Sequence, residues 1–198
     1  MRAPAAGAPA RTPRPQEPPH SRGADVHGRG RPSRPSGLCT TADEAGGNAN
    51  ADDPAIWRNP ADPGRSLVIA TAKQGGLRAY DLDARQVQSI PAPAGPGPDD
   101  KPGRFNNVDL VQGLRLGGAR ADVAVVSDRG NDRLRIYRID RDKPGGPLTD
   151  VTDPGARPVF SADQAETNEQ KTAYGLATWT DRATGRSYAL VSRRNRTR

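Results

Sequence analysis

Cysteine and histidine are almost absent from this sequence, and their scarcity limits its chemistry. Cys39 is the single cysteine, so no disulfide forms within the chain and no structural zinc site is available. His20 and His27 both lie near the N-terminus, which argues against a histidine-based triad or acid/base mechanism. The sequence also has no apolar run of about 18 residues, so we predict no membrane-spanning helix. It lacks both the GxxxxGK[ST] loop and the GxGxxG fingerprint of nucleotide sites.

The positive charge of the chain is concentrated at its two ends. The formal net charge is +7, but residues 1–37 hold seven arginines and residues 193–198 hold four. Between them, residues 46–192 carry 19 basic and 19 acidic side chains. A nucleic-acid-binding domain should carry a basic patch on its folded surface. We therefore expect neither a nucleic-acid nor a membrane partner, although the arginine-rich head could bind polyanions without specificity.

The composition predicts short strands and loops rather than a helical bundle. Only 33% of the residues are hydrophobic, while glycine and proline number 22 and 20. Residues 1–46 show no hydrophobic periodicity and are rich in Pro, Arg, Gly and Ala, so we expect a disordered head. From residue 47 to 198 we expect one all-β domain. Its strands are predicted at Leu67–Ala72, Leu77–Leu82, Asp122–Ser127, Leu134–Ile139, Tyr174–Thr180 and Tyr188–Ser192, with a loop or one helical turn at Ser161–Lys171.

The predicted strands repeat along the chain. An apolar strand, a polar turn and a second strand containing tyrosine occur twice, and a third copy begins at Tyr188, which is equivalent to Val68 and Val123. A repeat of this size is typical of β-propeller blades, which bury their strands against their neighbours. Two unrelated hairpins of a β-sandwich are the alternative. The second copy differs by two extra turn residues, Asp132 and Arg133.

Cations follow the first strand of each repeat. They stand at Lys73, Arg129 and Arg194, in turns that a propeller would bring to one end. Arginine offers phosphate a planar fork and lysine a point charge. Tyr174, beside a glycine, could offer its hydroxyl to the same phosphate, although such a tyrosine is often a half-buried strand residue. For any one turn a solvated hairpin is the better explanation; the three aligned turns together favour a site for a multiply charged anion.

Oxygen ligands suited to calcium occur in two segments. Asp52 and Asp53 precede Pro54, and Asn107 and Asp109 occupy alternate positions that face one side of a strand. Without further context, an aspartate that hydrogen-bonds its own turn is the better explanation of Asp52 and Asp53, and a hydrogen-bonded turn explains Asn107 and Asp109 about as well as a metal does.

Taken together, the segments resemble the β-propeller phytases. The resemblance runs in the family's order from about residue 47 to residue 194, through Ala51–Trp57, Thr71–Leu77, Phe105–Leu110, Asp122–Arg129, Ile136–Asp140, Tyr174–Leu176 and Thr184–Val191.

This resemblance implies a fold and an activity. The fold is the first half of a six-bladed propeller with bound calcium, and the activity is calcium-dependent, 3-phytase-type hydrolysis of phytate by metal-activated water. By matching position, the substrate's phosphates would be bound by Lys73, Arg129, Tyr174 and Arg194, and calcium by Asp53, Asn107 and Asp109. The catalytic residues stay unassigned. The family is secreted, so an extracellular monomer is expected.

The sequence departs from the family in three ways. Gln74 stands where the family usually has a second lysine, Arg194 replaces a lysine, and Asn195 replaces an acid. The resemblance covers about half of a family member, so we expect an incomplete chain with little or no turnover. The alternative is a non-catalytic, calcium-stabilised propeller segment that needs a partner chain.

Overall fold

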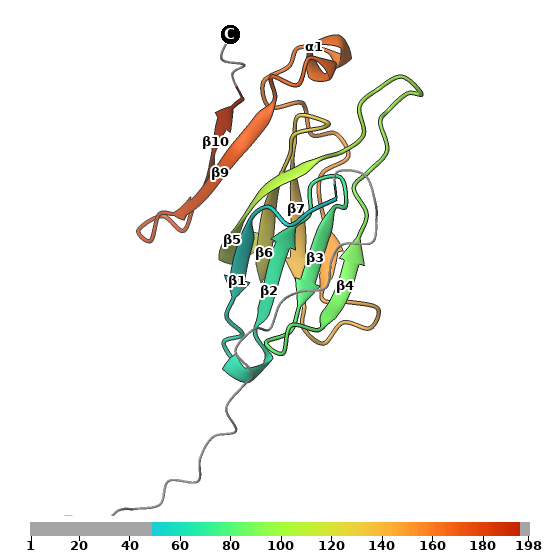
Figure 1. The fold of residues 1–198 in the computed structure, drawn as a ribbon. Helices are drawn as coiled ribbons and strands as arrows, with labels where there is room; N and C mark the ends of the chain where they lie inside the picture. Colours follow the sequence, from blue (N-terminus) through green and yellow to red (C-terminus); the bar gives the residue numbers. More distant parts are fainter. Residues whose placement is uncertain (1–48, 195–198) are drawn as a thin grey trace, which may run out of the picture. The chain divides into compact units, whose positions relative to one another are not determined.

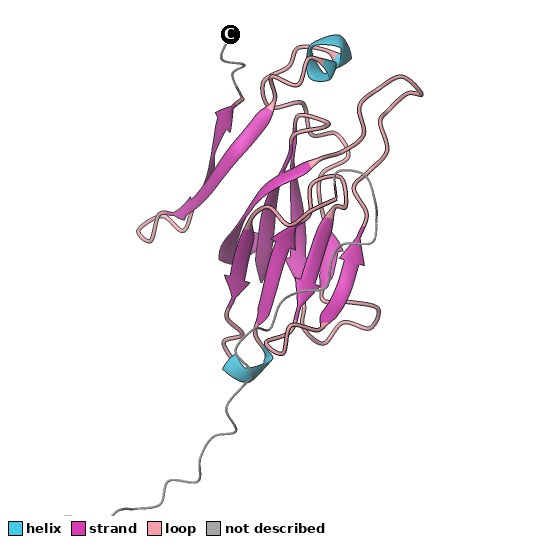
Figure 2. Cartoon of the chain, viewed as in Figure 1, coloured by secondary structure: helices cyan, strands magenta, loops and turns pink. Residues whose placement is uncertain are grey.

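The computed structural model describes residues 49–194, whose regular structure is almost entirely antiparallel strand, with long loops between the strands (Figure 2). Three sheets follow one another along the chain, and neighbouring strands within each sheet are consecutive in sequence. The all-β prediction is confirmed, and this succession of sheets agrees with the predicted partial propeller. The predicted disordered head, residues 1–46, lies outside the described residues.

The first sheet has four strands in the order β1-β2-β3-β4 (Figure 1). A single 3-10 turn, η1, separates the first two strands, and the Asp62 side chain caps it by accepting a hydrogen bond from the Gly64 amide. The elements are β1 (Pro54–Trp57), η1 (Pro63–Arg65), β2 (Leu67–Thr71), β3 (Leu77–Tyr80) and β4 (Gln86–Ile90).

The second sheet repeats this order with longer strands, and the third begins another copy. The second is β5-β6-β7-β8, and the third pairs β9 with β10. One short helix, α1, lies before β9 and is capped by the Asp163 carboxylate, which accepts from the Glu166 amide at 2.9 Å. The elements are β5 (Phe105–Leu116), β6 (Ala119–Asp128), β7 (Arg133–Ile139), β8 (Leu148–Asp150), α1 (Gln164–Asn168), β9 (Ala173–Thr180) and β10 (Ser187–Arg193).

Both faces of the second sheet are covered, which explains the unbroken apolar run in β6. Ala124 and Val126 pack against the first sheet, in a core that includes Leu67 and Ile69. Val123 and Val125 belong to a second cluster, against which Leu176 of β9 also packs. A strand buried on both faces has no polar side to alternate with its apolar side. This two-sided burial is what a middle blade of a propeller requires.

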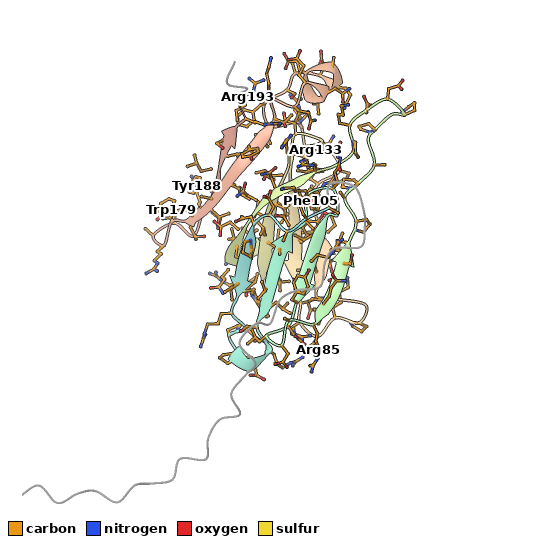
Figure 3. All side chains as sticks on the ribbon, viewed as in Figure 1. Arg85, Phe105, Arg133, Trp179, Tyr188 and Arg193 are labelled. Atoms are coloured by element: carbon orange, nitrogen blue, oxygen red, sulfur yellow. The ribbon has the colours of Figure 1, made fainter. Side chains whose placement is uncertain are left out.

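Aromatic residues divide between the core and the surface of the third sheet. Phe105 and Tyr137 are fully buried and meet with ring centroids 6.3 Å apart. Trp179 of β9 and Tyr188 of β10 stack on each other at 5.7 Å, yet they are 63% and 50% exposed (Figure 3). The third sheet therefore displays apolar surface where the second sheet buries it.

The repeat found in the sequence is confirmed, and the structure completes it. The two predicted strands of each copy are β2 and β3 in the first sheet, and β6 and β7 in the second. The list of predicted strands omitted four strands. Three of them, β1, β4 and β8, are three to five residues long and contain Pro54, two glutamines or an aspartate. The fourth, β5, has 12 residues, of which only the segment at Asn107 and Asp109 was considered as strand. The one helical turn proposed for Ser161–Lys171 is α1. Within residues 49–194, no helix has the length and apolar character needed to cross a bilayer.

Candidate functional site

The three predicted cation turns occupy equivalent places in the three sheets. Lys73 follows β2, Arg129 follows β6, and Arg194 follows β10. Each turn is hydrogen-bonded to residues at the start of the first strand of a sheet. At the start of β5, the Phe105 amide donates to the Lys73 carbonyl at 3.1 Å, and the Arg104 carbonyl accepts from the Arg129 amide at 2.8 Å. The Arg194 amide donates to the Thr172 carbonyl at 3.0 Å. These bonds hold all three turns at the same end of their sheets.

The Arg129 turn also contacts the next sheet. The Thr172 hydroxyl, just before β9, donates to the Arg129 carbonyl at 2.6 Å. The Ser127 hydroxyl of β6 donates to the Tyr174 carbonyl at 2.7 Å. These two bonds fix the start of β9 beside the turn, and they place the Arg129 guanidinium 5.7 Å from the centre of the Tyr174 ring, within the range of a cation–π contact.

Arg129 is the electrostatic centre of this group. Burial, and after it the charges of Arg194 and Arg104, lower the pKa of Arg129 to about 10, although Tyr174 and Asp52 act in the opposite direction. Its Nε atom is buried and has no hydrogen-bond acceptor among the described residues. A guanidinium that is partly desolvated, beside other cations and with a donor unused, is suited to an anionic ligand.

Lys73 is related to Arg129 through the carboxylate of Asp52. Its ammonium is 3.8 Å from the Asp52 carboxylate, and both side chains are about three-quarters buried. Because Asp52 also acts on the pKa of Arg129, this one carboxylate lies within electrostatic reach of two cations from different sheets. The structure therefore brings Lys73, Arg129, Tyr174 and Arg194 to the same end of the sheets. We call these four residues, together with Arg104, the cation rim.

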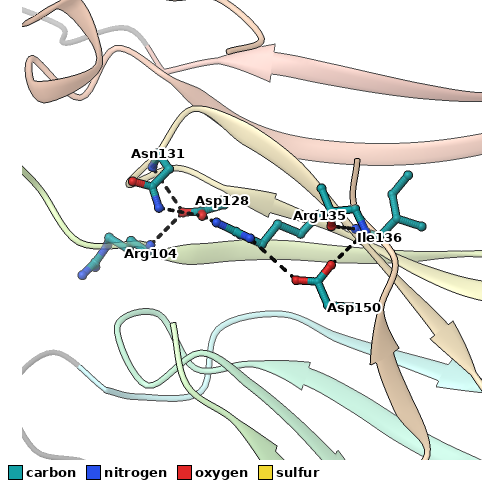
Figure 4. A network of polar contacts seen from close by, with 7 residues as sticks. Arg104, Asp128, Asn131, Arg135, Ile136 and Asp150 are labelled. Carbon is teal, nitrogen blue, oxygen red and sulfur yellow. Dashed lines mark hydrogen bonds and ion pairs between the residues drawn. The ribbon is translucent and has the colours of Figure 1, made fainter. Parts of the chain in front are cut away.

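The buried carboxylate of Asp128 connects the Arg104 segment to the turn that follows β6 (Figure 4). Asp128 is fully buried and accepts hydrogen bonds from the Arg104 amide at 3.0 Å and from the Asn131 side chain at 3.1 Å. Its second oxygen also accepts from the Arg135 Nε at 2.9 Å, and Arg135 in turn reaches Asp150. The charge of Asp128 is thus engaged by Arg135 and by backbone groups, and it fixes the turn that carries Arg129.

The insertion in the second repeat has a structural role. Asp132 is fully buried, has a positive φ of 49°, and its carboxylate accepts from three backbone amides. Those of Phe160 and Ser161 lie at 2.8 and 2.6 Å, and that of Ala173 at 2.8 Å. The insertion therefore anchors the long segment before β9 and fixes the strand that carries Tyr174.

The predicted metal ligands lie around the first half of β5. The Asp53 carboxylate accepts from the Val108 amide at 3.0 Å, and Val108 is the residue between Asn107 and Asp109. Asn107 and Asp109 are both half-buried, whereas Asn106 and Val108 are buried, and the pairing of β5 with β6 is irregular between Phe105 and Val108. The Asp109 carboxylate accepts from the Thr178 amide of β9 at 2.7 Å. Within residues 49–194, no three acidic, histidine or cysteine side chains gather as a metal site.

Sequence reasoning missed one member of the cation rim and left another unassigned. Arg104 precedes Phe105, the first residue of a segment used for the resemblance, and it belongs to no repeat turn, so no pattern singled it out. Asp52 was weighed as a calcium ligand with Asp53, but only Asp53 was assigned. The position of Arg104 immediately before the first strand of the second sheet is the one feature of the sequence that could have indicated it.

Comparisons with known proteins agree with this architecture. The family model described as Phytase matches residues 34–197, starting before the predicted boundary at residue 47. The chain is also similar to a 3-phytase of Bacillus subtilis (strain 168), with 37% identity over 150 residues. That match covers 75% of this chain and 34% of the relative, so the chain spans about a third of the relative's length. The chain belongs to the phytase family.

Proposed function

We propose that the cation rim binds the phosphate groups of phytate, and that the site serves calcium-dependent hydrolysis of its phosphate monoesters. The observation that carries the proposal is the environment of Arg129, whose guanidinium lies over the Tyr174 ring and is acted on by Arg194 and by Asp52. Asp52 is also the ion-pair partner of Lys73, so cations of three sheets are linked at this end. Arginine forks suit phosphate oxygens, and a partly desolvated guanidinium binds them more strongly than an exposed one. The 3-phytase relative supports the choice of substrate.

In this proposal Arg129 is the principal phosphate ligand. Its pKa of about 10 keeps it protonated at neutral pH, and its buried Nε has a donor available for a phosphate oxygen. The Tyr174 ring holds the guanidinium in place, so little side-chain freedom is lost when the ligand binds. Lys73 and Arg194 offset the remaining charge of the substrate from either side.

The calcium ligands proposed are Asp53, Asn107 and Asp109. Carboxylate and amide oxygens are the hard donors that calcium prefers, and the Asp53 carboxylate, from the segment before β1, reaches the Val108 amide between Asn107 and Asp109 of β5. A bound calcium ion would supply positive charge to the phosphate and lower the pKa of a water molecule. An extracellular site of action is part of the proposal, because the resemblance to a secreted family implies it.

Calorimetric binding of phytate, with phosphate release measured in parallel in calcium and in EGTA, tests this function. Binding that is lost in R129Q, together with release that stops in EGTA, supports the enzymatic proposal. Binding without any release agrees with the little or no turnover expected of an incomplete chain, whereas phytate binding that R129Q retains in full contradicts the proposed phosphate site. A wild-type chain that binds neither phytate nor calcium contradicts both the phosphate site and the calcium site.

A further inference from the structure

Each of the three sheets carries an equivalent pair of apolar residues on the strand that leads to its cation turn. One member stands six positions before the cation and the other stands four positions before it. In the order of the sheets, the pairs are Leu67 and Ile69, Val123 and Val125, and Tyr188 and Leu190. The structure thus shifts by one residue the sequence alignment of Val68 with Tyr188, because Leu67 pairs with Trp57 as Tyr188 pairs with Trp179.

These equivalent residues are buried in the first two sheets and exposed in the third. Ile69 is fully buried against the second sheet, and Val125 is 6% exposed beneath the third. Leu190, their equivalent, is 77% exposed. The neighbouring strands show the same contrast, since Trp57 is 5% exposed and Trp179 is 63% exposed (Figure 3). The third sheet therefore presents the face that a following sheet covers in each of the other two.

The first sheet presents the opposite kind of face, the one that meets a preceding sheet. In the second sheet Leu110 lies on this face and packs against the core shared with the first sheet. In the third sheet Thr178 lies on it, and its hydroxyl donates to the Leu110 carbonyl at 2.8 Å. Ile56 is their equivalent, because it precedes Trp57 as Leu110 precedes Val111, and it is 69% exposed. Among residues 49–194, no sheet precedes the first one to cover it.

The two open faces are related in the same way as the faces that meet inside the chain. Val125 is covered by the face that carries Thr178, so the surface that fits Leu190 is a face that carries an equivalent of Thr178. This chain has such a face free at Ile56. Residues 1–37, with their seven arginines, are poorly suited to cover an apolar face. A second copy of the chain is therefore the occupant that the surface fits.

We propose that two copies of this chain associate into a closed ring, in which the third sheet of each copy packs on the first sheet of the other. Two copies of three sheets give six, within the range of four to eight blades found in closed propellers. A two-fold axis along the ring makes the two contacts identical and leaves both cation rims at the same end. This dimer takes the place of the expected monomer. It goes beyond the proposed function, because neither face includes a residue of the cation rim.

Sedimentation equilibrium of the full chain measures this association. The wild type is expected at twice the mass of one chain. L190K and I56E should each weaken the association about a hundredfold or more, because each places an unpaired charge in both contacts of the pair. V151K is the matched control, since Val151 is an exposed apolar residue that lies on neither face, and it should change the association less than about twofold. Thermal unfolding checks that each variant is folded.

A mixture of L190K and I56E tests the reciprocal arrangement itself. In a mixed pair one contact joins the two opposite charges, and the other contact is unmodified. The mixture should therefore associate within about tenfold of the wild type, although neither variant associates alone. Pairing through the free edge of β10 would instead leave I56E as well associated as the wild type, and that result would overturn the inference.

Tryptophan fluorescence gives a second measurement, because Trp57 and Trp179 are the only tryptophans. Trp57 is buried in the single chain, so acrylamide quenching reports on Trp179 and should be weak in the wild type and stronger in L190K. A monomeric wild type contradicts the inference, whether its Trp179 is quenched or is shielded by another part of the same chain. An open series of larger assemblies, or a mixture that stays monomeric, contradicts the closed ring.

Discussion

The Asp132 Oδ1 atom accepts a hydrogen bond from the Ala173 backbone amide at 2.8 Å, although 41 residues separate the two. This bond connects the turn after Arg129 to the first residue of the strand that carries Tyr174. The same carboxylate accepts from the amides of Phe160 and Ser161, so a single buried side chain organises the segment between the second and third sheets.

Replacement of Asp132 should destabilise the chain strongly. D132A leaves three backbone amides without their acceptor, and each unsatisfied buried donor costs about 1–3 kcal/mol, so we expect a loss of about 3 kcal/mol or more in urea unfolding. D153N is the control, because the exposed Asp153 caps only a local turn through Gly155. A D132A chain as stable as D153N would show that the carboxylate does not anchor this segment.

Gly130 is required for steric reasons alone. Its φ is not in the left-handed region, but an added Cβ would overlap the Pro102 carbonyl oxygen. G130A should therefore separate the Arg104 segment from the Arg129 turn, with a loss of about 1–3 kcal/mol from overpacking and a parallel loss of phytate affinity. G155A adds a Cβ that meets only the Asp153 side chain at 3.3 Å, and it should leave both quantities nearly unchanged. Equal stability of the two variants is the result that contradicts this explanation.

Removal of the Arg129 charge should stabilise the free chain. The pKa of Arg129 is lowered to about 10 in the folded state, so folding weakens its hold on the proton. The protonated side chain therefore opposes folding at every pH below about 10, and this cost disappears as the pH rises from about 10 to the higher pKa of the unfolded chain. Discounted for solvent screening and for the lost contact with Tyr174, R129Q should gain about 1 kcal/mol at neutral pH.

Urea unfolding at low and high ionic strength measures this effect. Salt screens the repulsion among Arg104, Arg129 and Arg194, so it should stabilise the wild type more than R129Q and reduce the gain. The gain should stay constant through the neutral range, because Arg129 does not titrate there. A variant that is less stable than the wild type at low salt would contradict the electrostatic account.

Calcium should raise the thermal stability of the chain through Asp53. D53N keeps an oxygen to accept the Val108 amide but removes the charge that calcium needs, so its calcium-induced shift in Tm should be smaller than that of the wild type. The comparison uses each variant with EGTA as its own reference, which removes any effect of the substitution on the apo chain. D153N should retain the full shift. A shift of equal size in D53N would exclude Asp53 as a ligand.

The repeat and the position of its turns could be predicted from the sequence because they depend on local patterns. The apolar run at Val123–Val126 and the turn before Leu134 predict the strands of the second sheet. The ends of the predicted strands in turn predict that Lys73 and Arg129 lie at the same end of their sheets. Short or polar strands such as β4 could not be predicted, because their residues show no alternation and they form only by pairing with β3.

The missing parts of the cation rim depend on contacts between distant segments. Arg104 joins the group through backbone bonds to two turns, and Asp132 anchors amides 28 to 41 residues away. Neither relationship leaves a periodic signal. The metal ligands illustrate the same limit: the sequence predicted that Asn107 and Asp109 share a face, but not that Asp109 would bond to Thr178 on another sheet.

The affinity of the full chain for inositol hexakisphosphate, measured by calorimetry for the wild type, R129Q and R138Q, tests the central claim most directly. If the cation rim is the phosphate site, R129Q binds at least about tenfold more weakly than the wild type, while R138Q, which loses the same charge elsewhere on the surface, binds within about twofold. Equal affinity of R129Q and R138Q would contradict the claim that these turns form a binding site.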